Sequence, residues 1–257
     1  MNAKKSLGQH FLTSSQIARR IVRSGSVRKG DTVLEIGPGT GILTEALLET
    51  GARVIAIEKD DRVIEMLNER FKDYREKDLF KLIQGDALEF SPLRNEIPKH
   101  YKVISNIPYY ITGALIRKFL EADLHPEKIV FLVQKEVASR IAREKKASLL
   151  SISVKVYGTP HYIETIKARF FKPEPRVDSA ILLIDDISKK FFKNIDESTF
   201  FEIVKRAFSQ KRKMLIGNLS SMFDKKDLER LFMEMNIDRR IRAEDASMEL
   251  WRILAEK

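Results

Sequence analysis

The chain has 257 residues, a formal net charge of +10, four histidines and no cysteine. The lack of cysteine excludes disulfides, thiolate metal sites and cysteine nucleophiles, and with four scattered histidines we expect no transition-metal site. No apolar run approaches the roughly 18 residues that a membrane-spanning helix needs, so we expect no membrane partner. The positive charge favours a polyanionic partner; a merely soluble basic protein is the alternative.

The first 30 residues contain seven lysines and arginines and no acidic residue. Such a composition is also found in transit peptides. The stretch Gly8-Gln9-His10-Phe11-Leu12 lies within it, however, and favours a role in the folded protein. Because nothing resembles a secretory signal, we expect a cytoplasmic location.

From Asp31 onward, strand and helix patterns alternate along the chain. Short β-branched runs predict strands and apolar residues at helical spacing predict helices. Strands are predicted at 32–36, 53–58, 79–84, 102–105 and 129–133, and helices at 42–49, 62–71, 114–120 and 136–145. The alternation predicts an α/β fold whose sheet is mostly parallel and has helices on both faces.

The later part of the chain changes character. Residues 149–157 and 179–185 are predicted to be two further strands that pair antiparallel at one edge of the sheet. After Ile187 only helical patterns follow, at 200–208, 214–222, 226–235 and 247–255. We therefore predict a larger domain over 1–186 and a small all-helical domain over 187–257.

A glycine-rich turn is predicted after the first strand, in the stretch LEIGPGTG. Its glycines are Gly37, Gly39 and Gly41. Glycine lets the backbone turn tightly and approach a ligand closely. The third glycine stands one place too early for a dinucleotide fingerprint, because Ile42 takes the expected position, and no P-loop motif is present.

Acidic and amide residues follow the next three strands. Glu58 ends the second strand, where an acid can hold ribose hydroxyls, and Asp86 follows the third, where it can accept from an adenine amino group. Asn106 follows the fourth. Helix caps or turn residues are the alternative for each one. Together with Glu35 and the glycine loop, the pattern resembles that of S-adenosylmethionine-dependent methyltransferases.

The stretch Asn106-Ile107-Pro108-Tyr109 resembles the [DNS]-x-P-[YF] motif of methyltransferases that modify exocyclic amino groups of nucleobases. An adenine N6 is a poor nucleophile, because its lone pair is delocalised into the ring. Acceptors from Asn106 and from the Ile107 or Pro108 carbonyl would favour a tetrahedral nitrogen, and Tyr109 would stack on the unstacked base. The alternative is a strand that ends at a proline before a helix capped by Thr112.

The whole chain resembles the ribosomal RNA adenine N6,N6-dimethyltransferases. The similar segments are KSLGQHFL (5–12), EIGPGTG (35–41), GDAL (85–88), NIPYY (106–110), VQKEVASRI (133–141), FFKPEPRVDSA (170–180) and FSQKRKML (208–215). The resemblance implies a Rossmann-like class I methyltransferase fold. It also implies S-adenosyl-L-methionine-dependent dimethylation of two adjacent adenosines near the 3′ end of small-subunit (16S) ribosomal RNA, a step of ribosome biogenesis.

The same resemblance implies further site residues. The segment 1–30 would close over the cofactor through His10 and Leu12, and Lys59 and Ala87 would join Glu58 and Asp86 in the cofactor site. Phe171 would supply a second aromatic ring against the target base, although Phe170 beside it leaves that assignment open by one place.

The segment 205–213, KRAFSQKRK, has five cations and no acid. A solvated helix face is one interpretation, and a phosphate-binding surface is the functional one. Phe208 would be the apolar anchor of this segment. The five candidate RNA-binding residues are Lys205, Arg206, Lys211, Arg212 and Lys213, and a second group, Arg140, Arg143, Lys145 and Lys146, could extend the surface.

Two other functions share parts of this pattern. One is an adenine N6-methyltransferase of large-subunit (23S) RNA that confers antibiotic resistance. The other is a non-catalytic ribosome assembly factor with the same fold, which an eroded cofactor loop would favour. The intact residues Gly37, Glu58, Asp86 and Asn106 favour an enzyme, and we expect it to be a monomer.

Overall fold

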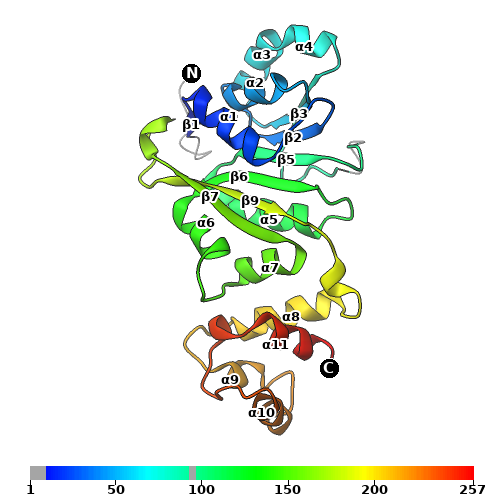
Figure 1. Ribbon diagram of the computed structural model, residues 1–257, viewed down its shortest axis with the longest axis vertical. Coiled ribbons are helices and arrows are strands. Elements are labelled where there is room, and N and C mark those ends of the chain that lie inside the picture. Colours follow the sequence, from blue (N-terminus) through cyan, green and yellow to red (C-terminus); the bar gives the residue numbers. More distant parts are fainter. Residues whose placement is uncertain (1–9, 93–96) are drawn as a thin grey trace.

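A seven-stranded sheet forms the centre of the larger part of the molecule (Figure 1). The computed structural model describes residues 10–92 and 97–257. The strand order is β4-β3-β2-β5-β6-β9-β7. The parallel strands are β2 (Thr32–Ile36), β3 (Arg53–Glu58), β4 (Phe80–Gln84), β5 (Lys102–Asn106) and β6 (Lys128–Gln134). At one edge β9 (Ser179–Asp185) runs antiparallel to β6, and β7 (Thr159–Ile166) antiparallel to β9.

Helices cover both faces of this sheet. One face carries α1 (Ser15–Ser24), α2 (Ile42–Leu48), α3 (Asp61–Arg70) and the short α4 (Lys72–Glu76). The other carries α5 (Thr112–Glu121), α6 (Lys135–Ala142) and α7 (Leu149–Tyr157). The predicted α/β fold with a mostly parallel sheet and an antiparallel edge is therefore confirmed.

The two hydrophobic cores follow from the period of two along each strand. In β6, Ile129, Phe131 and Val133 belong to the core under α5–α7, whereas Val130 and Leu132 belong to the core under α1–α3. Successive side chains of a strand point to opposite faces. The interior of a central parallel strand is thus apolar, as residues 129–133 of β6 are between Lys128 and Gln134 at its ends.

The prediction of a strand at 149–157 was wrong, because this segment forms α7. Ser148 caps the helix: its hydroxyl accepts from the Ser151 N–H, and the Ser151 hydroxyl accepts from the Ser148 N–H. Most of α7 is buried, including Ile152, Val154 and Val156. A helix buried on most of its surface lacks the single apolar stripe that identifies helices in a sequence.

The edge strand β7 was not predicted. It begins Thr159-Pro160, and a proline argues against a strand because it has no N–H for the ladder. Since β7 is the outermost strand, Pro160 pairs with Ile184 of β9 on one side and needs no partner on the other. The antiparallel edge was thus predicted correctly, but its second member was assigned to the wrong segment.

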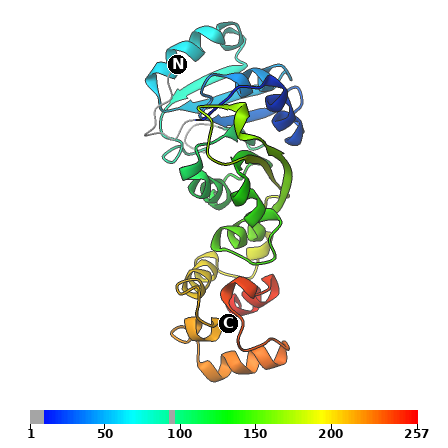
Figure 2. The same cartoon turned by 90° about the vertical axis from the view of Figure 1, so that its left-hand side faces the viewer.

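The C-terminal part consists of α8 (Glu197–Ala207), α9 (Leu215–Leu219), α10 (Lys225–Glu234) and α11 (Met248–Ala255). Figure 2 shows this helical part, coloured yellow to red, at the opposite end of the molecule from the cyan helices α3 and α4. The predicted boundary falls at Asp186, directly after β9, where the backbone has a φ of +51°. The hydrophobic core does not end there, because Tyr157 of α7 stacks with Phe201 of α8 and contacts Phe192.

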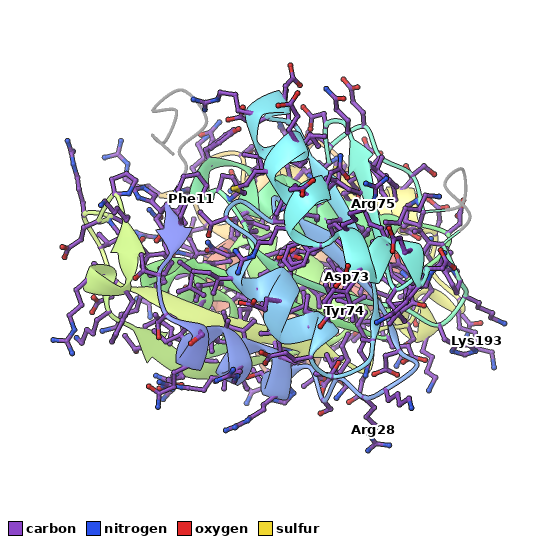
Figure 3. All side chains as sticks on the ribbon, turned by 90° about the horizontal axis from the view of Figure 1, so that it is seen from above. Phe11, Arg28, Asp73, Tyr74, Arg75 and Lys193 are labelled. Carbon is purple, nitrogen blue, oxygen red and sulfur yellow. The ribbon has the colours of Figure 1, made fainter. Side chains whose placement is uncertain are left out.

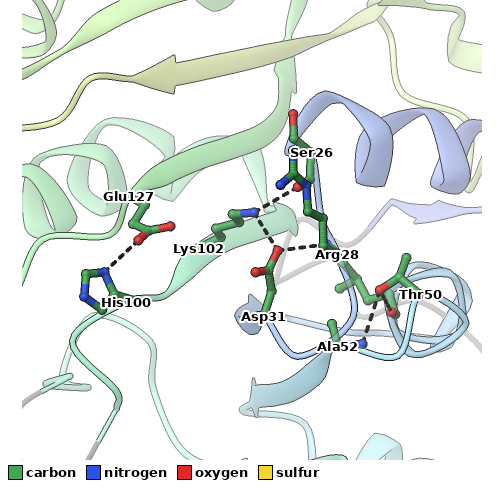
Figure 4. A network of polar contacts seen from close by, with 9 residues as sticks. Ser26, Arg28, Asp31, Thr50, Ala52, His100, Lys102 and Glu127 are labelled. Atoms are coloured by element: carbon green, nitrogen blue, oxygen red, sulfur yellow. Dashed lines mark hydrogen bonds and ion pairs between the residues drawn. The ribbon is translucent and has the colours of Figure 1, made fainter.

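A polar network fixes the amino-terminal ends of β2 and β5 (Figure 4). The Lys102 ammonium donates to Asp31 at 2.6 Å and to the Ser26 carbonyl at 2.9 Å, and its side chain is only 9% exposed. The Arg28 N–H donates to the same carboxylate. This pairing ties α1 and the two strands together at the end of the sheet away from the cavity described next. None of the helices among residues 10–92 and 97–257 has the length and hydropathy to cross a membrane.

Candidate active site

A cavity lies where the parallel strands end, beside β2 and β5. The chain passes from β2 outward to β4 on one side and then returns to β5 on the other, so the strand order reverses between them. Doubly wound sheets bind ligands at this point. The cavity has a volume of about 230 Å³. It is lined by residues at or just after the ends of β2, β3, β4 and β5, among them Gly37, Glu58, Asp86 and Asn106. We call it the strand-end cavity.

The glycine loop after β2 forms one wall of this cavity. Gly37 has a φ of +63°, and a Cβ atom placed there would meet nothing within 4 Å, so its backbone faces open space. At Gly39 (φ +55°) a Cβ would lie 2.8 Å from the Phe11 ring. This glycine therefore accommodates a side chain from the N-terminal part of the chain as well as a left-handed backbone.

Glu58 ends β3 and is only 6% exposed. Its Oε1 accepts from the backbone N–H groups of Lys59 and Asp60, each at 2.8 Å. Burial raises the pKa of Glu58, and the backbone hydrogen bonds oppose that rise. The carboxylate thus holds the turn into α3 and also presents an acceptor to the cavity.

Asp86 lies on the same wall after β4. Its Oδ1 accepts from the Leu88 N–H and its Oδ2 from the Lys59 ammonium, both at 2.8 Å. The hydrogen bond from Lys59 is the main reason why the pKa of Asp86 is lowered. Because the Lys59 side chain is 62% exposed, it can move aside when another donor needs this carboxylate.

Glu35 lies beneath the glycine loop and is buried. The Thr44 hydroxyl donates to its Oε2 at 2.7 Å. Burial raises the pKa of Glu35 to about 8, so the side chain carries a proton at neutral pH. A small hollow of about 20 Å³ connects Glu35 with Leu12 and shares Gly37 and Asn106 with the strand-end cavity.

Asn106 and Tyr109 close the cavity on the side of β5. The Asn106 Nδ2 donates to the His10 carbonyl at 3.0 Å. The Tyr109 hydroxyl and the Ser179 hydroxyl share a hydrogen bond of 2.7 Å. The His10 ring stacks on Tyr109 with centroids 5.5 Å apart and planes inclined by 27°. Burial raises the pKa of Tyr109, so its hydroxyl stays neutral near pH 7.

Residues 10–13 form a strap across this end of the sheet, which we call the N-terminal strap. Its strand β1 (Phe11–Leu12) pairs antiparallel with β8 (Phe171–Lys172). The Thr13 N–H and hydroxyl both donate to the Phe170 carbonyl at 2.9 Å, and His10 Nδ1 lies 2.8 Å from the Pro173 carbonyl. Figure 3 labels Phe11 on β1, at one side of the sheet. Of the predicted closing segment 1–30, residues 1–9 lie outside the described residues, and Ser15–Ser24 form α1 against one face of the sheet.

The structure brings most of the predicted site residues together. Those that line the strand-end cavity are His10, Gly37, Gly39, Glu58, Lys59, Asp86, Ala87, Asn106, Pro108 and Tyr109. Among the described residues, no group of three or more acids and histidines is arranged to hold a metal ion.

Two predicted residues lie elsewhere. Leu12 is 4% exposed and belongs to the core under α1–α3, next to the small hollow. Phe171 is also 4% exposed and belongs to the same core. Phe170, the other candidate for the second aromatic ring, is partly exposed. The ambiguity between the two rings arose because a sequence cannot tell which of two adjacent side chains points inward.

Some residues of the cavity were not predicted. Ile36 and Ile57 are the last or next-to-last residues of their strands, a position that could have identified them. Tyr110 also lines the cavity and is 67% exposed, the second tyrosine of the NIPYY stretch. Phe11 belongs to the GQHFL stretch, but its contact with Gly39 could not be predicted from the sequence, because only the fold brings the two residues together.

The basic segment 205–213 lies at the end of α8 and in the loop before α9. All five predicted cations are exposed, and among the described residues Lys205, Lys211, Arg212 and Lys213 have no ion-pair partner. The buried Asn218 side chain shapes the loop, because its Nδ2 donates to the carbonyls of Ala207 and Gln210 at 2.6 and 3.1 Å.

An aromatic contact connects the start of this loop to α11. Phe208 stacks on Trp251 of α11, with centroids 6.1 Å apart, so the predicted anchor packs against a side chain of the C-terminal part. In the second basic group, three of the four side chains already contact other residues of the protein. Arg140 pairs with Glu136, Lys146 pairs with Glu244, and Arg143 covers the Tyr162 ring.

Known proteins resemble this chain over almost its full length. The family model for ribosomal RNA adenine dimethylase matches residues 1–256. A Dehalococcoides mccartyi protein named ribosomal RNA small subunit methyltransferase A is 40% identical over 260 residues, which cover 99% of this chain and 88% of its own. A Lactobacillus johnsonii protein of the same name is 36% identical, with coverages of 96% and 88%.

A solved structure is also similar to this chain over almost its full length. A dimethyladenosine transferase from Plasmodium falciparum superposes with a TM-score of 0.78 at 25% identity and covers 95% of this chain and 96% of its own. Together with the family model and the 36–40% identities, this likeness includes the helical C-terminal part as well as the sheet. The chain belongs to the ribosomal RNA adenine dimethylase family.

Proposed function

We propose that this protein transfers methyl groups from S-adenosylmethionine to N6 of two adjacent adenosines near the 3′ end of small-subunit ribosomal RNA, as part of ribosome biogenesis. The observation that carries the proposal is the meeting of Asn106, Pro108 and Tyr109 with Glu58 and Asp86 around one cavity. The named function of the 36–40% identical relatives supports the choice of the small subunit.

The residues of the strand-end cavity suit an adenosine cofactor. When bound, S-adenosylmethionine supplies a methyl group on a positively charged sulfur. Glu58 offers a carboxylate for ribose hydroxyls, and Asp86 offers one for an adenine amino group once Lys59 moves aside. Because Gly37 has no side chain, the space that a Cβ would occupy stays free for a ligand beside its backbone. Ile36 and Ile57, near the ends of β2 and β3, would contact the adenine base of the cofactor.

Asn106 and Tyr109 would act on the target base. An acceptor at the Asn106 amide oxygen and one at a neighbouring carbonyl would hold the two N6 hydrogens before the first transfer, and one of them would hold the remaining hydrogen before the second. These bonds stabilise the tetrahedral nitrogen of the transition state. Tyr109 would hold the base by stacking. Its raised pKa keeps the phenol neutral, which argues against a phenolate that removes a proton. We propose partly exposed Phe170, rather than buried Phe171, as the second ring against the base.

The C-terminal part would hold the RNA. The unpaired cations of the segment 205–213 suit phosphate contacts, which position an RNA without reading its sequence. We expect the enzyme to act as a monomer in the cytoplasm, where ribosomal subunits are assembled.

A large-subunit enzyme remains the second candidate. A 23S rRNA methyltransferase, ErmE, superposes with a TM-score of 0.76 and covers 96% of this chain, but its 23% identity shows only a shared fold. The relatives named for the small subunit are more similar.

The test is to map methylated adenosines by primer extension on ribosomal RNA from cells that lack this gene. Restoring the wild-type gene should bring back modification of small-subunit RNA. The Asn106→Ala variant should turn over about 100-fold more slowly or worse, the usual effect of losing one transition-state hydrogen bond, while its affinity for the small subunit stays unchanged. Restored modification of large-subunit RNA instead, or near-normal turnover in Asn106→Ala, would overturn the proposal.

A further inference from the structure

The N-terminal strap touches Asn106 through a bond whose direction is fixed. The Asn106 Nδ2 lies 3.0 Å from the His10 carbonyl. A backbone carbonyl can only accept, so the amide must turn its amino group toward the strap. Its oxygen therefore lies on the other side, and no described residue donates to it. This is the orientation in which Asn106 can accept a hydrogen from a substrate amino group.

The same strap holds Tyr109. The His10 ring stacks on the Tyr109 ring, and His10 Nδ1 is bound to the Pro173 carbonyl at 2.8 Å. Ser179 holds the hydroxyl end of Tyr109 at 2.7 Å. The ring plane is therefore fixed by a stacked neighbour on one face and a hydrogen bond at its tip.

The strap depends on residues far from it in the sequence. Phe11 and Leu12 pair with β8, and Thr13 donates twice to the Phe170 carbonyl. Phe11 also lies over Gly39, where any Cβ would collide with its ring. If the strap came away from β8 and Gly39, the Asn106 amide would lose its acceptor and Tyr109 its stacked neighbour at the same time.

We propose that docking of the N-terminal strap sets the working orientation of Asn106 and Tyr109, with His10 as a positioning residue for methyl transfer. The proposal rests on the function proposed above. His10 acts on Asn106 through its main chain and on Tyr109 through its ring. Preorganised acceptors accelerate a reaction because they need no rearrangement at the moment of attack. The strap supplies that preorganisation from outside the motif.

Four variants separate the interactions of the strap. His10→Ala removes the ring and its bond to Pro173, whereas His10→Phe keeps a ring that can stack. Thr13→Val removes one bond to the Phe170 carbonyl at nearly constant shape, and Thr13→Ser keeps that hydroxyl. The rate of a single turnover is measured with saturating S-adenosylmethionine and pre-bound small subunits, so that binding defects do not contribute.

His10→Ala should slow this step about tenfold, since small misplacements of reacting groups reduce rates by such factors. His10→Phe should recover part of the loss. Thr13→Val should be slower than the wild type by a few-fold and Thr13→Ser should match it. Equal rates for His10→Ala and the wild type would overturn the proposal.

A double-mutant cycle tests whether His10 acts through Asn106. In an Asn106→Ala background the amide is already gone, so His10→Ala should cost clearly less than it does alone. Fully additive losses would mean that His10 acts independently of Asn106, and they would overturn its positioning role.

One measurement needs no substrate. Asn106→Asp places a carboxylate oxygen against the His10 carbonyl, so the strap should detach more often and the Thr13 amide should exchange with deuterium several-fold faster. Asn106→Ala, which loses the bond without repulsion, should lie between this variant and the wild type. Unchanged exchange in Asn106→Asp would overturn the strap coupling whatever the substrate is. An inactive wild type with faster exchange in Asn106→Asp would overturn the proposed function and leave the coupling of the strap to Asn106 in place.

Discussion

Tyr109 is held at both its ring and its hydroxyl, which changes what its substitution should do. From the sequence alone, Tyr109→Phe is expected to be mild because the ring is kept. In the structure the hydroxyl bonds the fully buried Ser179, and a buried hydroxyl left without a partner is costly. The sequence could not predict this, because Ser179 lies in β9, far along the chain from the motif.

We therefore expect graded losses in single-turnover methyl transfer. Tyr109→Ala should cost roughly 1–3 kcal/mol of base stacking, and Tyr109→Phe about 1 kcal/mol because Ser179 loses its partner. Adding Ser179→Ala to Tyr109→Phe removes the unpaired group and should restore part of the rate. If Phe and Ala at position 109 were equally slow, the hydroxyl rather than the ring plane would be the essential group.

The buried proton on Glu35 makes the stability of the protein depend on pH. Burial raises its pKa from 4.5 to about 8. Between these values the unfolded chain loses this proton while the folded protein keeps it, so Glu35 lowers the stability as the pH rises from about 5 to 8. Below this window its contribution is fully present, and above it there is no further change.

Glu35→Gln keeps the shape and an acceptor for Thr44 but cannot ionise. Relative to the wild type, its free energy of unfolding should rise by at most about 1.4 kcal/mol for each pH unit across this window. Urea unfolding at pH 5, 6.5 and 8 measures the difference, in which the titrating groups that do not interact with Glu35 cancel. A constant difference between the two proteins would show that Glu35 is ionised in the folded state.

At the scale of elements, the parallel strands and their ends were predictable, and the segments held by long-range contacts were not. The ends of β2 to β5 carry turn and acid residues that identify them in the sequence. The strap strand β1 has two residues and gains its structure only from β8. Likewise, β-branched residues alternate with serine and lysine in α7, as they would in a strand. Because α7 is buried between the sheet and the C-terminal helices, its sequence lacks the apolar spacing of an amphipathic helix.

The segment 205–213, at the end of α8 and in the loop before α9, carries the clearest prediction about RNA. Neutralising Lys205, Arg206, Lys211, Arg212 and Lys213 together should weaken binding to the small subunit. The slope of log affinity against log salt should flatten by about one unit for each phosphate that the variant no longer neutralises. Cofactor affinity should not change, because all residues that line the strand-end cavity lie between His10 and Ile111, in the other part of the molecule.

A matched control removes the same number of charges elsewhere. Suitable exposed cations, on or near α4, β4 and the start of β5, are Lys72, Arg75, Lys77, Lys81 and Lys99. Their neutralisation should leave the salt slope close to that of the wild type. Equal slopes for the two variants would mean that the segment 205–213 is a solvated surface, and that net charge alone drives association.

At the scale of the whole molecule, the two parts of the chain share one core. Tyr157 and Phe201 stack across the predicted boundary, the Tyr157 hydroxyl bonds Glu197, and the Ala147 N–H donates to the Glu244 carbonyl at 2.7 Å. The boundary near residue 186 therefore marks where strand patterns stop in the sequence. It does not mark a gap in the packing, which composition alone could not reveal.

We expect the protein to unfold in one cooperative transition in differential scanning calorimetry, with calorimetric and van't Hoff enthalpies in agreement. Truncation of the buried Phe200 to Ala removes a large side chain from this shared core, and it should cost about 3–5 kcal/mol and shift the whole transition to lower temperature. Two separate transitions, of which only one moves in Phe200→Ala, would show that the parts unfold independently.

The stacking of Phe208 on Trp251 gives the protein an optical signal of its own. Trp251 is the only tryptophan in the chain, it is fully buried, and its neighbour Phe208 begins the loop that carries Lys211 to Lys213. Excitation near the red edge of protein absorption therefore selects a single indole beneath the basic loop. Its emission reports on the surroundings of Trp251 and Phe208, so RNA docking at the basic loop can be followed in the unlabelled enzyme.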